Sequence, residues 1–187
     1  MNEKTDTDLI NAIAEGGYRK DKAFTELYNR YSTRVYLYCR KMIGDGHYAD
    51  DIFQETFLKF LDAVEKGIFI QNVLGYLLKT SRNLNYNYKR DNAKIFVTLE
   101  NFHVPIIDNS IESVEFSNLI EQALNLLPEE HKEAFVLQAY EGFTYNEIGD
   151  IVSAPVSTVR NRIVRAKRKL REILLPYLEF SRNKSYE

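Results

Sequence analysis

The stretch VSTVRNRIVRAKRKLR, residues 156–171, decides the fold of the C-terminal half of the chain. It carries seven basic side chains and no acid. The preceding segment, 116–155, carries seven acids and a single lysine, although the whole chain has a net charge of only −2. Charge sorted this sharply predicts one positive surface, and nucleic acid phosphate is the partner expected for it.

The same stretch has the period of an amphipathic helix. Its apolar residues recur at steps of four, three and four, which places them on one stripe of a helix. They are Val159, Ile163, Ala166 and Leu170. The face opposite this stripe is polar and basic. An ordinary solvated face would have the same pattern, so the segment just upstream decides between the two interpretations.

A short helix is predicted upstream, over 145–152. Thr144 and Glu147 have the spacing of a capping box, in which each side chain bonds the other residue's backbone N–H. Pro155 disfavours the helical region for Ala154 and is tolerated at the start of a new helix. A short helix, a tight turn and a basic amphipathic helix together predict a DNA-binding helix-turn-helix, whose second helix enters the major groove.

Three side chains at the start of the second helix suit base recognition. Arginine pairs bidentately with guanine and asparagine with adenine, so Arg160, Asn161 and Arg165 are candidates for reading sequence. The remaining basic residues are expected to hold phosphates.

Composition limits the remaining possibilities. With 44% hydrophobic residues, four prolines and eight glycines in 187 residues, the chain is predicted to be all-α. The single cysteine, Cys39, fits a reducing compartment and is expected to be a buried thiol. The N-terminal residues lack the apolar core of a signal peptide and no run is long enough to span a membrane, so we expect a cytoplasmic protein.

Two small helical domains joined by an acidic linker are predicted: 5–90, linker 91–115, and 116–180. Helices are expected near 6–15, 20–43, 48–65, 73–90, 113–126, 129–141, 145–152 and 156–177. The second domain is expected to bury an apolar core and to use Gly142 as a left-handed cap. The core residues are Leu119, Ile120, Ala123, Leu124, Leu127, Phe135, Val136 and Leu137.

An acidic, aromatic-rich helix lies at 50–61. Offsets of three, four and seven place four of its residues on one face, apart from the aromatic core face. They are Asp51, Gln54, Glu55 and Leu58. An ordinary solvated face is one alternative. A metal site is the other, but no matching ligand cluster exists elsewhere in the sequence. Its ligands would be His47, Asp50, Asp51 and Glu55.

The next helix, 74–90, interleaves tyrosine with arginine, lysine and asparagine. Unpaired bases stack on aromatic rings while basic groups follow the backbone, so this mixture suits single-stranded nucleic acid. Tyrosines at the edge of an amphipathic core are the alternative.

The order of these parts resembles that of bacterial RNA polymerase sigma factors of the extracytoplasmic-function (ECF) group, over nearly the whole chain. Residues 50–58, DDIFQETFL, resemble the group's ED-x-x-QE-x-F-x helix, and residues 76–90 resemble its WL-x-x-IARN helix. Its −35-binding domain is matched by 126–135, 145–148 and 157–162. Three motifs in the expected order and separation make the resemblance specific.

The resemblance implies a dissociable specificity subunit with three groups of site residues. The group that docks on the β′ clamp helices of core polymerase is Asp51, Gln54, Glu55 and Leu58. In the loop 65–73, Gln71 and Asn72 are our candidates for reading a base flipped from the opened strand. The full group for the melted −10 element is Gln71, Asn72, Tyr76, Arg82, Asn83, Tyr86 and Lys89. The −35 group is Ser157, Thr158, Arg160, Asn161, Arg165 and Arg168.

The implied partners are core RNA polymerase, through its β′ clamp helices and β flap, promoter DNA, and an anti-sigma factor tethered to a membrane. No cofactor, metal or small-molecule substrate is expected. The sequence departs from the family pattern at Tyr76, where tryptophan is usual, at Ser81 for alanine, at Asn87 for aspartate, and at Pro155 for a polar cap.

Two rival functions remain at this stage. A conventional helix-turn-helix repressor or activator would bind duplex DNA alone and would need no polymerase-docking helix. An enzyme is the other, but the histidines are scattered, and neither a phosphate-binding glycine loop nor a nucleophile–base pair is visible. We therefore predict that the chain is not an enzyme.

Overall fold

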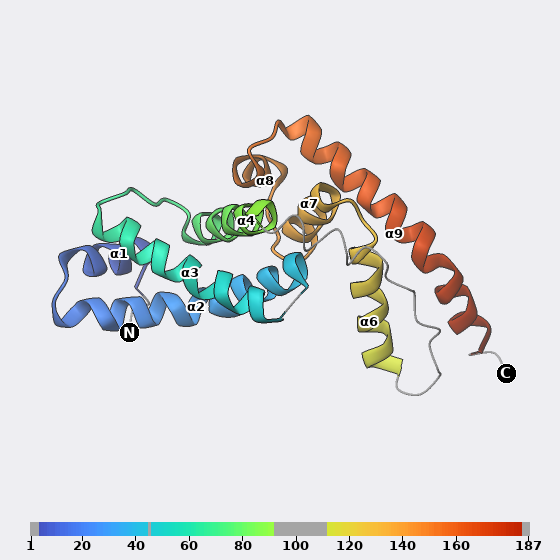
Figure 1. The fold of residues 1–187 in the computed structure, drawn as a ribbon, viewed down its shortest axis with the longest axis horizontal. Coiled ribbons are helices and arrows are strands. Elements are labelled where there is room, and N and C mark those ends of the chain that lie inside the picture. The colour runs from blue at the N-terminus through green and yellow to red at the C-terminus, as the bar shows by residue number, and fades with distance from the viewer. Residues whose placement is uncertain (1–3, 45, 92–111, 185–187) are drawn as a thin grey trace. The chain divides into compact units, whose positions relative to one another are not determined.

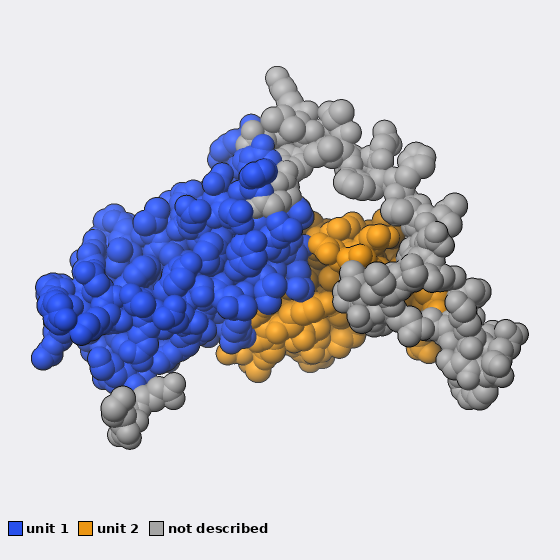
Figure 2. All heavy atoms as spheres, turned by 90° about the horizontal axis from the view of Figure 1, so that it is seen from below, with its two compact units in different colours: residues 1–96 blue, residues 97–187 orange. Residues whose placement is uncertain are grey.

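The computed structural model describes residues 4–44, 46–91 and 112–184, and all regular secondary structure in these ranges is helical (Figure 1). The chain divides into two compact units, residues 1–96 and 97–187 (Figure 2). The first contains α1 (Asp6–Glu15), α2 (Tyr18–Ile43), α3 (Gly46–Glu65) and α4 (Val73–Asp91). The second contains α6 (Glu112–Asn125), α7 (Glu129–Ala139), α8 (Tyr145–Val152) and α9 (Val156–Lys184). The all-α prediction is confirmed.

The predicted helix boundaries differ from the observed ones mainly at α9. This helix continues through Pro176 to Lys184, beyond the predicted end at 177. Residues 178–184 contain neither glycine nor proline, so no stop signal ends the helix there. Of the predicted linker 91–115, residues 92–111 lie outside the described residues, and Glu112 already begins α6.

The first unit is held together by an aromatic cluster between α2 and α3. Tyr28 and Phe57 have ring centroids 4.8 Å apart, Phe53 and Phe57 5.3 Å, and Tyr36 and Phe53 5.5 Å. Tilted and edge-to-face pairs of this kind contribute beyond the area that they bury. Phe60 is also fully buried. Because α3 turns its aromatic side toward α2, its acidic side is left outside.

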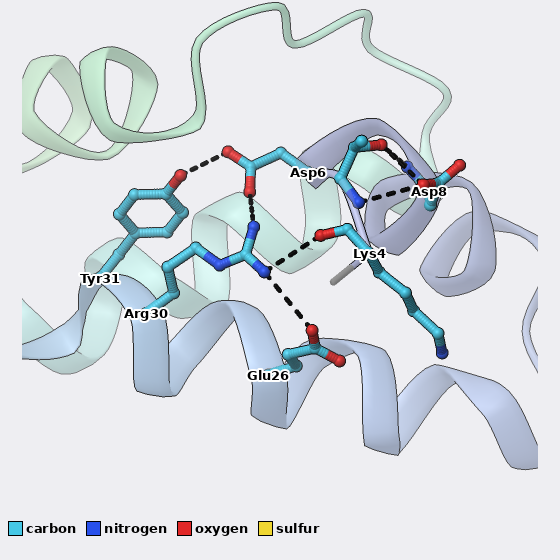
Figure 3. A network of polar contacts seen from close by, with 7 residues as sticks. Lys4, Asp6, Asp8, Glu26, Arg30 and Tyr31 are labelled. Atoms are coloured by element: carbon cyan, nitrogen blue, oxygen red, sulfur yellow. Dashed lines mark hydrogen bonds and ion pairs between the residues drawn. The ribbon is translucent and has the colours of Figure 1, made fainter. Parts of the chain in front are cut away.

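A polar network fastens α1 to α2 (Figure 3). The Arg30 guanidinium donates to the carboxylate of Asp6, to the Lys4 carbonyl at 3.1 Å and to Glu26 at 3.4 Å. The Tyr31 hydroxyl donates to the other oxygen of Asp6. Burial and the neighbouring carboxylate raise the pKa of Tyr31 to about 12, so the phenol keeps the proton that it donates.

Three small polar side chains meet in the core of the first unit, one from each of α2, α3 and α4. The hydroxyl oxygens of Thr56 and Ser81 are 2.9 Å apart, and Ser81 also hydrogen bonds with Cys39. All three residues are buried. Burial raises the pKa of the Cys39 thiol to about 11, so it remains protonated at neutral pH, and the prediction of a buried thiol is confirmed.

The apolar stripe predicted for the basic helix forms the core of the second unit. All four of its residues are buried, and Ala166 and Leu170 pack against Ala123, Leu124 and Leu127. The predicted core is confirmed, with Ile120 and Phe135 only partly buried. Gly142 takes a φ of 74°, as expected for the turn after α7. None of the described helices combines the length and apolarity needed to cross a bilayer.

Candidate functional site

The helix-turn-helix is built as the sequence predicts. Thr144 and Glu147 form the capping box at the start of α8, with the Thr144 N–H donating to Glu147 Oε2 at 2.8 Å. The helix ends at Ser153, whose φ of 55° is left-handed, and the Ala154 N–H closes the turn on the Gly149 carbonyl at 3.0 Å.

A glycine is required inside this turn. A Cβ atom at Gly149 would stand 2.8 Å from the backbone carbonyl oxygen of Ala154, closer than real Cβ contacts come. The Pro155 carbonyl then accepts the Thr158 N–H at 2.9 Å and the Val159 N–H at 3.1 Å, which starts α9. The start of α9 is thereby fixed relative to α8, as base reading requires.

The predicted −35 residues lie together on the first turns of α9. Thr158 is half-buried beside the core, and the remaining five are exposed: Ser157, Arg160, Asn161, Arg165 and Arg168. Because the apolar stripe fixes the rotation of the helix, these side chains point away from the unit's core. The arrangement offers several cationic donors and one amide to a groove.

The α7 helix supports the recognition helix from one side. Arg162 of α9 forms an ion pair with Glu130 of α7, and most of its side chain is covered. Next to this pair, burial lowers the pKa of His131, and the charges of Arg165 and Arg162 lower it further. Arg162 therefore contributes to holding α9 against α7, whereas Arg165 is exposed.

Sequence reasoning missed one residue on this surface. Val164 lies on the outward face of α9 among the basic residues and is 57% exposed. An apolar side chain that stands off the buried stripe of a DNA-reading helix matches the C5-methyl group of thymine. The signal was present in the sequence, because Val164 follows Ile163 and cannot share its buried face.

The four predicted docking residues form a continuous face on α3. Asp51, Gln54, Glu55 and Leu58 are all exposed, as the offsets predict. Leu58 is 66% exposed, although its neighbours Phe57 and Phe60 are buried. Glu55 pairs with Lys59 at 3.3 Å on the surface. An exposed leucine surrounded by carboxylates and an amide is a surface for a protein partner with basic and apolar groups.

The α4 helix carries a second polar face, of different character. The guanidinium of Arg82 lies over the ring of Tyr86, 4.5 Å from its centroid. Lys89 follows one turn later, and Asn83 is exposed beside them. The aromatic and basic groups are therefore already stacked and partly covered, which reduces the entropy lost when a base stacks on them.

Two of the −10 residues predicted in the loop between α3 and α4 and at the start of α4 also make structural contacts. Asn72 is exposed, but its Oδ1 accepts the Gly75 N–H at 2.8 Å, so it also caps α4. Tyr76 is half-buried, with its ring 6.1 Å from that of Phe60, and has a packing role. Gln71 is exposed. Phe69, which the sequence analysis did not select, is 88% exposed.

Two family models match the chain. Sigma-70 region 2 matches residues 27–95, which include α3 and α4. The model described as Sigma-70, region 4 matches residues 117–170, which include α7, α8 and the basic part of α9. The two matches thus coincide with the surfaces described above.

Named relatives cover most of the chain. It is 28% identical over 166 residues to the ECF RNA polymerase sigma factor SigW of Bacillus subtilis, covering 81% of this chain and 89% of that protein. It is 30% identical over 182 residues to the ECF RNA polymerase sigma factor SigE of Mycolicibacterium smegmatis, covering 92% of this chain and 68% of that protein.

Solved structures share the fold. The sigma factor RpoE of Bartonella quintana, solved in complex with the anti-sigma factor NepR, matches with a TM-score of 0.67 and 21% identity, over 82% of this chain and 97% of that one. CnrH, solved with the cytosolic domain of CnrY, matches with a TM-score of 0.67 and 22% identity, over 90% and 96%. Together with the relatives, this places the chain in the ECF group of sigma factors, the promoter-recognition subunits of RNA polymerase.

Proposed function

We propose that the three exposed faces divide the work of transcription initiation. The α3 face docks on core polymerase, the α4 face and the preceding loop hold the opened −10 strand, and α9 reads the −35 duplex. The observation that carries the proposal is that each face has its own chemistry: acidic and apolar on α3, aromatic and basic on α4, basic on α9. Residues 5–90 would form one functional domain and 116–180 the other.

On α3, Leu58 is the anchor. An exposed leucine loses its contact with water when a partner covers it, and surrounding polar residues exclude solvent from the contact. Asp51, Gln54 and Glu55 surround Leu58 and would complement basic groups on the β′ clamp helices, the docking partner that the family resemblance implies. The chain would supply specificity and no catalytic step of its own.

On α4, the Arg82–Tyr86 stack and Lys89 are the contacts for the opened strand. A base stacked on this platform gains about 1–3 kcal/mol, with the lysine following the backbone. Gln71 reads a flipped base, whose extrusion costs a few kcal/mol that the pocket contacts must offset. The exposed ring of Phe69 adds a stacking surface at the same loop. Asn72 and Tyr76 act mainly by shaping the loop and the helix start.

On α9, the contacts divide into base reading and phosphate binding. Arg160, Asn161 and Arg165 donate to base edges, and Val164 lies against a thymine methyl group. Ser157, Thr158 and Arg168 hold the backbone.

Two further partners are part of the proposal. The β flap of core polymerase would hold the second unit, as the family resemblance implies. An anti-sigma factor would hold the chain inactive. This rests on the fold neighbours, whose solved structures are complexes with an anti-sigma factor or with the cytosolic domain of CnrY.

Run-off transcription tests the proposed function. Purified core polymerase is supplied with or without this chain, on DNA taken from upstream of the operon that encodes it. We expect a specific transcript only with the chain present, and loss of that transcript with Leu58→Asp. A matched control is Leu37→Asp, which changes an exposed leucine of α2 that lies outside the three proposed faces. No chain-dependent transcript, or equal loss with both variants, would contradict the proposal.

A further inference from the structure

A histidine lies where the first turn of α7 contacts the recognition helix α9. The Glu130 carboxylate is paired with Arg162 of α9, which fastens this turn of α7 to one flank of α9. His131 is the next residue, and its N–H donates to the Pro128 carbonyl at 2.9 Å, so its backbone is held in the same turn. His131 is partly exposed, so a ligand on this flank of α9 can reach it.

The charges that act on His131 come mainly from the recognition helix. Burial lowers the pKa of His131, the charges of Arg165 and Arg162 lower it further, and Glu130 raises it. Arg165 follows Arg162 by three residues and therefore lies on the same flank of α9. The imidazole is thus neutral in the free chain at neutral pH. The other charged residues near this turn are Glu129 and Lys132 of α7 and, on α8, which also packs against α7, Asp150 and the capping residue Glu147.

A purely structural account would make His131 a partly covered residue on the surface of α7. That account explains the neutral imidazole, because burial by itself disfavours the charged form. It gives no reason for a group that can acquire a charge to stand beside Arg165, to which we assign base reading. The position next to a DNA-reading side chain therefore needs a second explanation.

We propose that His131 is a further contact of the −35 duplex, whose imidazole takes up a proton from solvent on binding and donates a hydrogen bond to a backbone phosphate. The proposal rests on the proposed function, in which α9 lies in the major groove. A helix in this groove, which is about 12 Å wide, has a phosphate backbone along each flank. The first turn of α7 would then lie beside one of these backbones.

The charge balance on this flank favours a protonated imidazole once DNA is bound. Arg162 and Glu130 neutralise each other, so Arg165 is the cation that repels a proton on His131. A phosphate nearby replaces this repulsion by attraction and raises the pKa of His131 in the complex. A lysine at this position would repel both arginines permanently in the free chain, whereas histidine acquires its charge only when the phosphate is present.

This coupling makes DNA binding depend on pH in one direction. The complex holds more protons than the free chain and free DNA together, so affinity rises as the pH falls. The gain begins as the pH falls through the pKa of His131 in the complex and is complete below its pKa in the free chain. It is lost as the pH rises above the pKa in the complex.

The test measures the DNA affinity of the polymerase holoenzyme formed with the full chain, at pH 7.5 and pH 6.0 and over a series of salt concentrations. One probe is a promoter fragment with both elements, and the other ends between the elements and lacks the −35 duplex. The variants are His131→Gln, which cannot be protonated, and His131→Lys, which is charged at both pH values. The matched control is His47→Gln, which removes a histidine from α3 in the other unit.

We expect the wild type to bind the full probe about threefold to tenfold more tightly than His131→Gln at pH 6.0, and nearly equally at pH 7.5. At the lower pH its slope of log K against log salt should be steeper by about 0.9, for one added phosphate contact. His131→Lys should keep the steeper slope at both pH values, and His47→Gln should match the wild type. On the shortened probe all four proteins should show the same pH dependence.

Two results would overturn the inference. The same pH dependence and salt slope for the wild type and His131→Gln on the full probe would leave His131 a purely structural role. A difference of equal size on the shortened probe would place the effect outside the −35 contact. Failure of the proposed function is distinguishable, because the wild type would then bind both probes equally well at both pH values.

Discussion

The helices α9 and α4, for which we propose contacts with duplex and with single-stranded DNA, expose their polar side chains to different degrees. The proposed base readers of α9 are exposed, whereas Arg82, Tyr86 and Lys89 of α4 are all partly covered. A duplex holds its base edges in fixed positions, so side chains only need to reach into the groove. A single strand is flexible, and a partner that is already stacked and partly fixed limits the entropy lost on binding.

The buried faces of the two helices differ in polarity. The buried stripe of α9 is apolar throughout, while that of α4 includes Ser81 and Asn85. Asn85 Oδ1 has no hydrogen-bond partner among the described residues. The position of α4 is thus determined partly by polar contacts such as Thr56–Ser81, which hold one register only. We therefore expect α4 to tolerate surface changes less well than α9.

The largest effect in this comparison is expected from two glycine substitutions. Gly149→Ala places a methyl group 2.8 Å from a backbone carbonyl oxygen, whereas Gly75→Ala meets an atom of the Asn72 side chain at 3.1 Å, so a shift of a few tenths of an ångström relieves the contact. We expect Gly149→Ala to cost about 3 kcal/mol of unfolding free energy in the second unit, at the upper end of overpacking effects. Denaturant unfolding of each variant measures this, and a larger cost for Gly75→Ala would reverse our account of the turn.

Arg165→Ala tests reading of the duplex. We expect −35 binding by the holoenzyme to weaken by about 1–3 kcal/mol and base preference to relax at one position, if its guanidinium bonds a guanine bidentately. Arg162→Ala is the comparison, because the ion pair with Glu130 places Arg162 in a supporting role. Footprinting with promoter variants provides both values. Unchanged affinity and base preference for Arg165→Ala would remove it from the reading group.

Tyr86→Leu tests the stacking platform. Loss of the ring should weaken binding of a single-stranded −10 oligonucleotide to the holoenzyme by about 1–2 kcal/mol, within the range for one stacked base. Tyr18→Leu is matched to it, because Lys22 lies over the Tyr18 ring at 4.7 Å in the same spacing but on α2. Fluorescence anisotropy measures both, and equal losses would show that stacking on α4 is not specific.

The smallest expected effect is the change in folding stability with pH that His131 causes. The pKa of His131 is lowered from 6.5 by burial and by Arg165 and Arg162, so the folded state binds fewer protons than the unfolded state. Stability from the neutral imidazole is present above about pH 6.5 and is lost as the pH falls below it. Thermal melting of the chain from pH 7.5 to 5.5 should show this decline, and His131→Gln should reduce it. An identical pH profile for His131→Gln would refute the assignment.

Much of the fold could be predicted because apolar and polar residues recur with a regular helical period along α3 and α9. The stripe from Val159 to Leu170, the capping box at Thr144 and the α3 face around Leu58 all follow from spacing alone. Family membership then displaces the interpretation as a conventional helix-turn-helix regulator.

The sequence could not show how the loop and α4 use their polar residues. An asparagine such as Asn72 can hydrogen bond either to a base or to the start of a helix. Only the contact of its Oδ1 with the Gly75 N–H shows that it caps α4. Ser81 and Cys39 lie far apart in sequence, so their meeting with Thr56 depends on how three helices pack. The −10 residues themselves remain predictions.

The most direct test of the division of labour is the affinity of the chain for core polymerase, measured by fluorescence titration for Leu58→Asp and Arg165→Ala side by side. The account predicts that Leu58→Asp loses about 2 kcal/mol or more, roughly thirtyfold, as expected for an interface anchor, while Arg165→Ala binds like the wild type. Equal affinity for all three proteins, or a loss confined to Arg165→Ala, would contradict it.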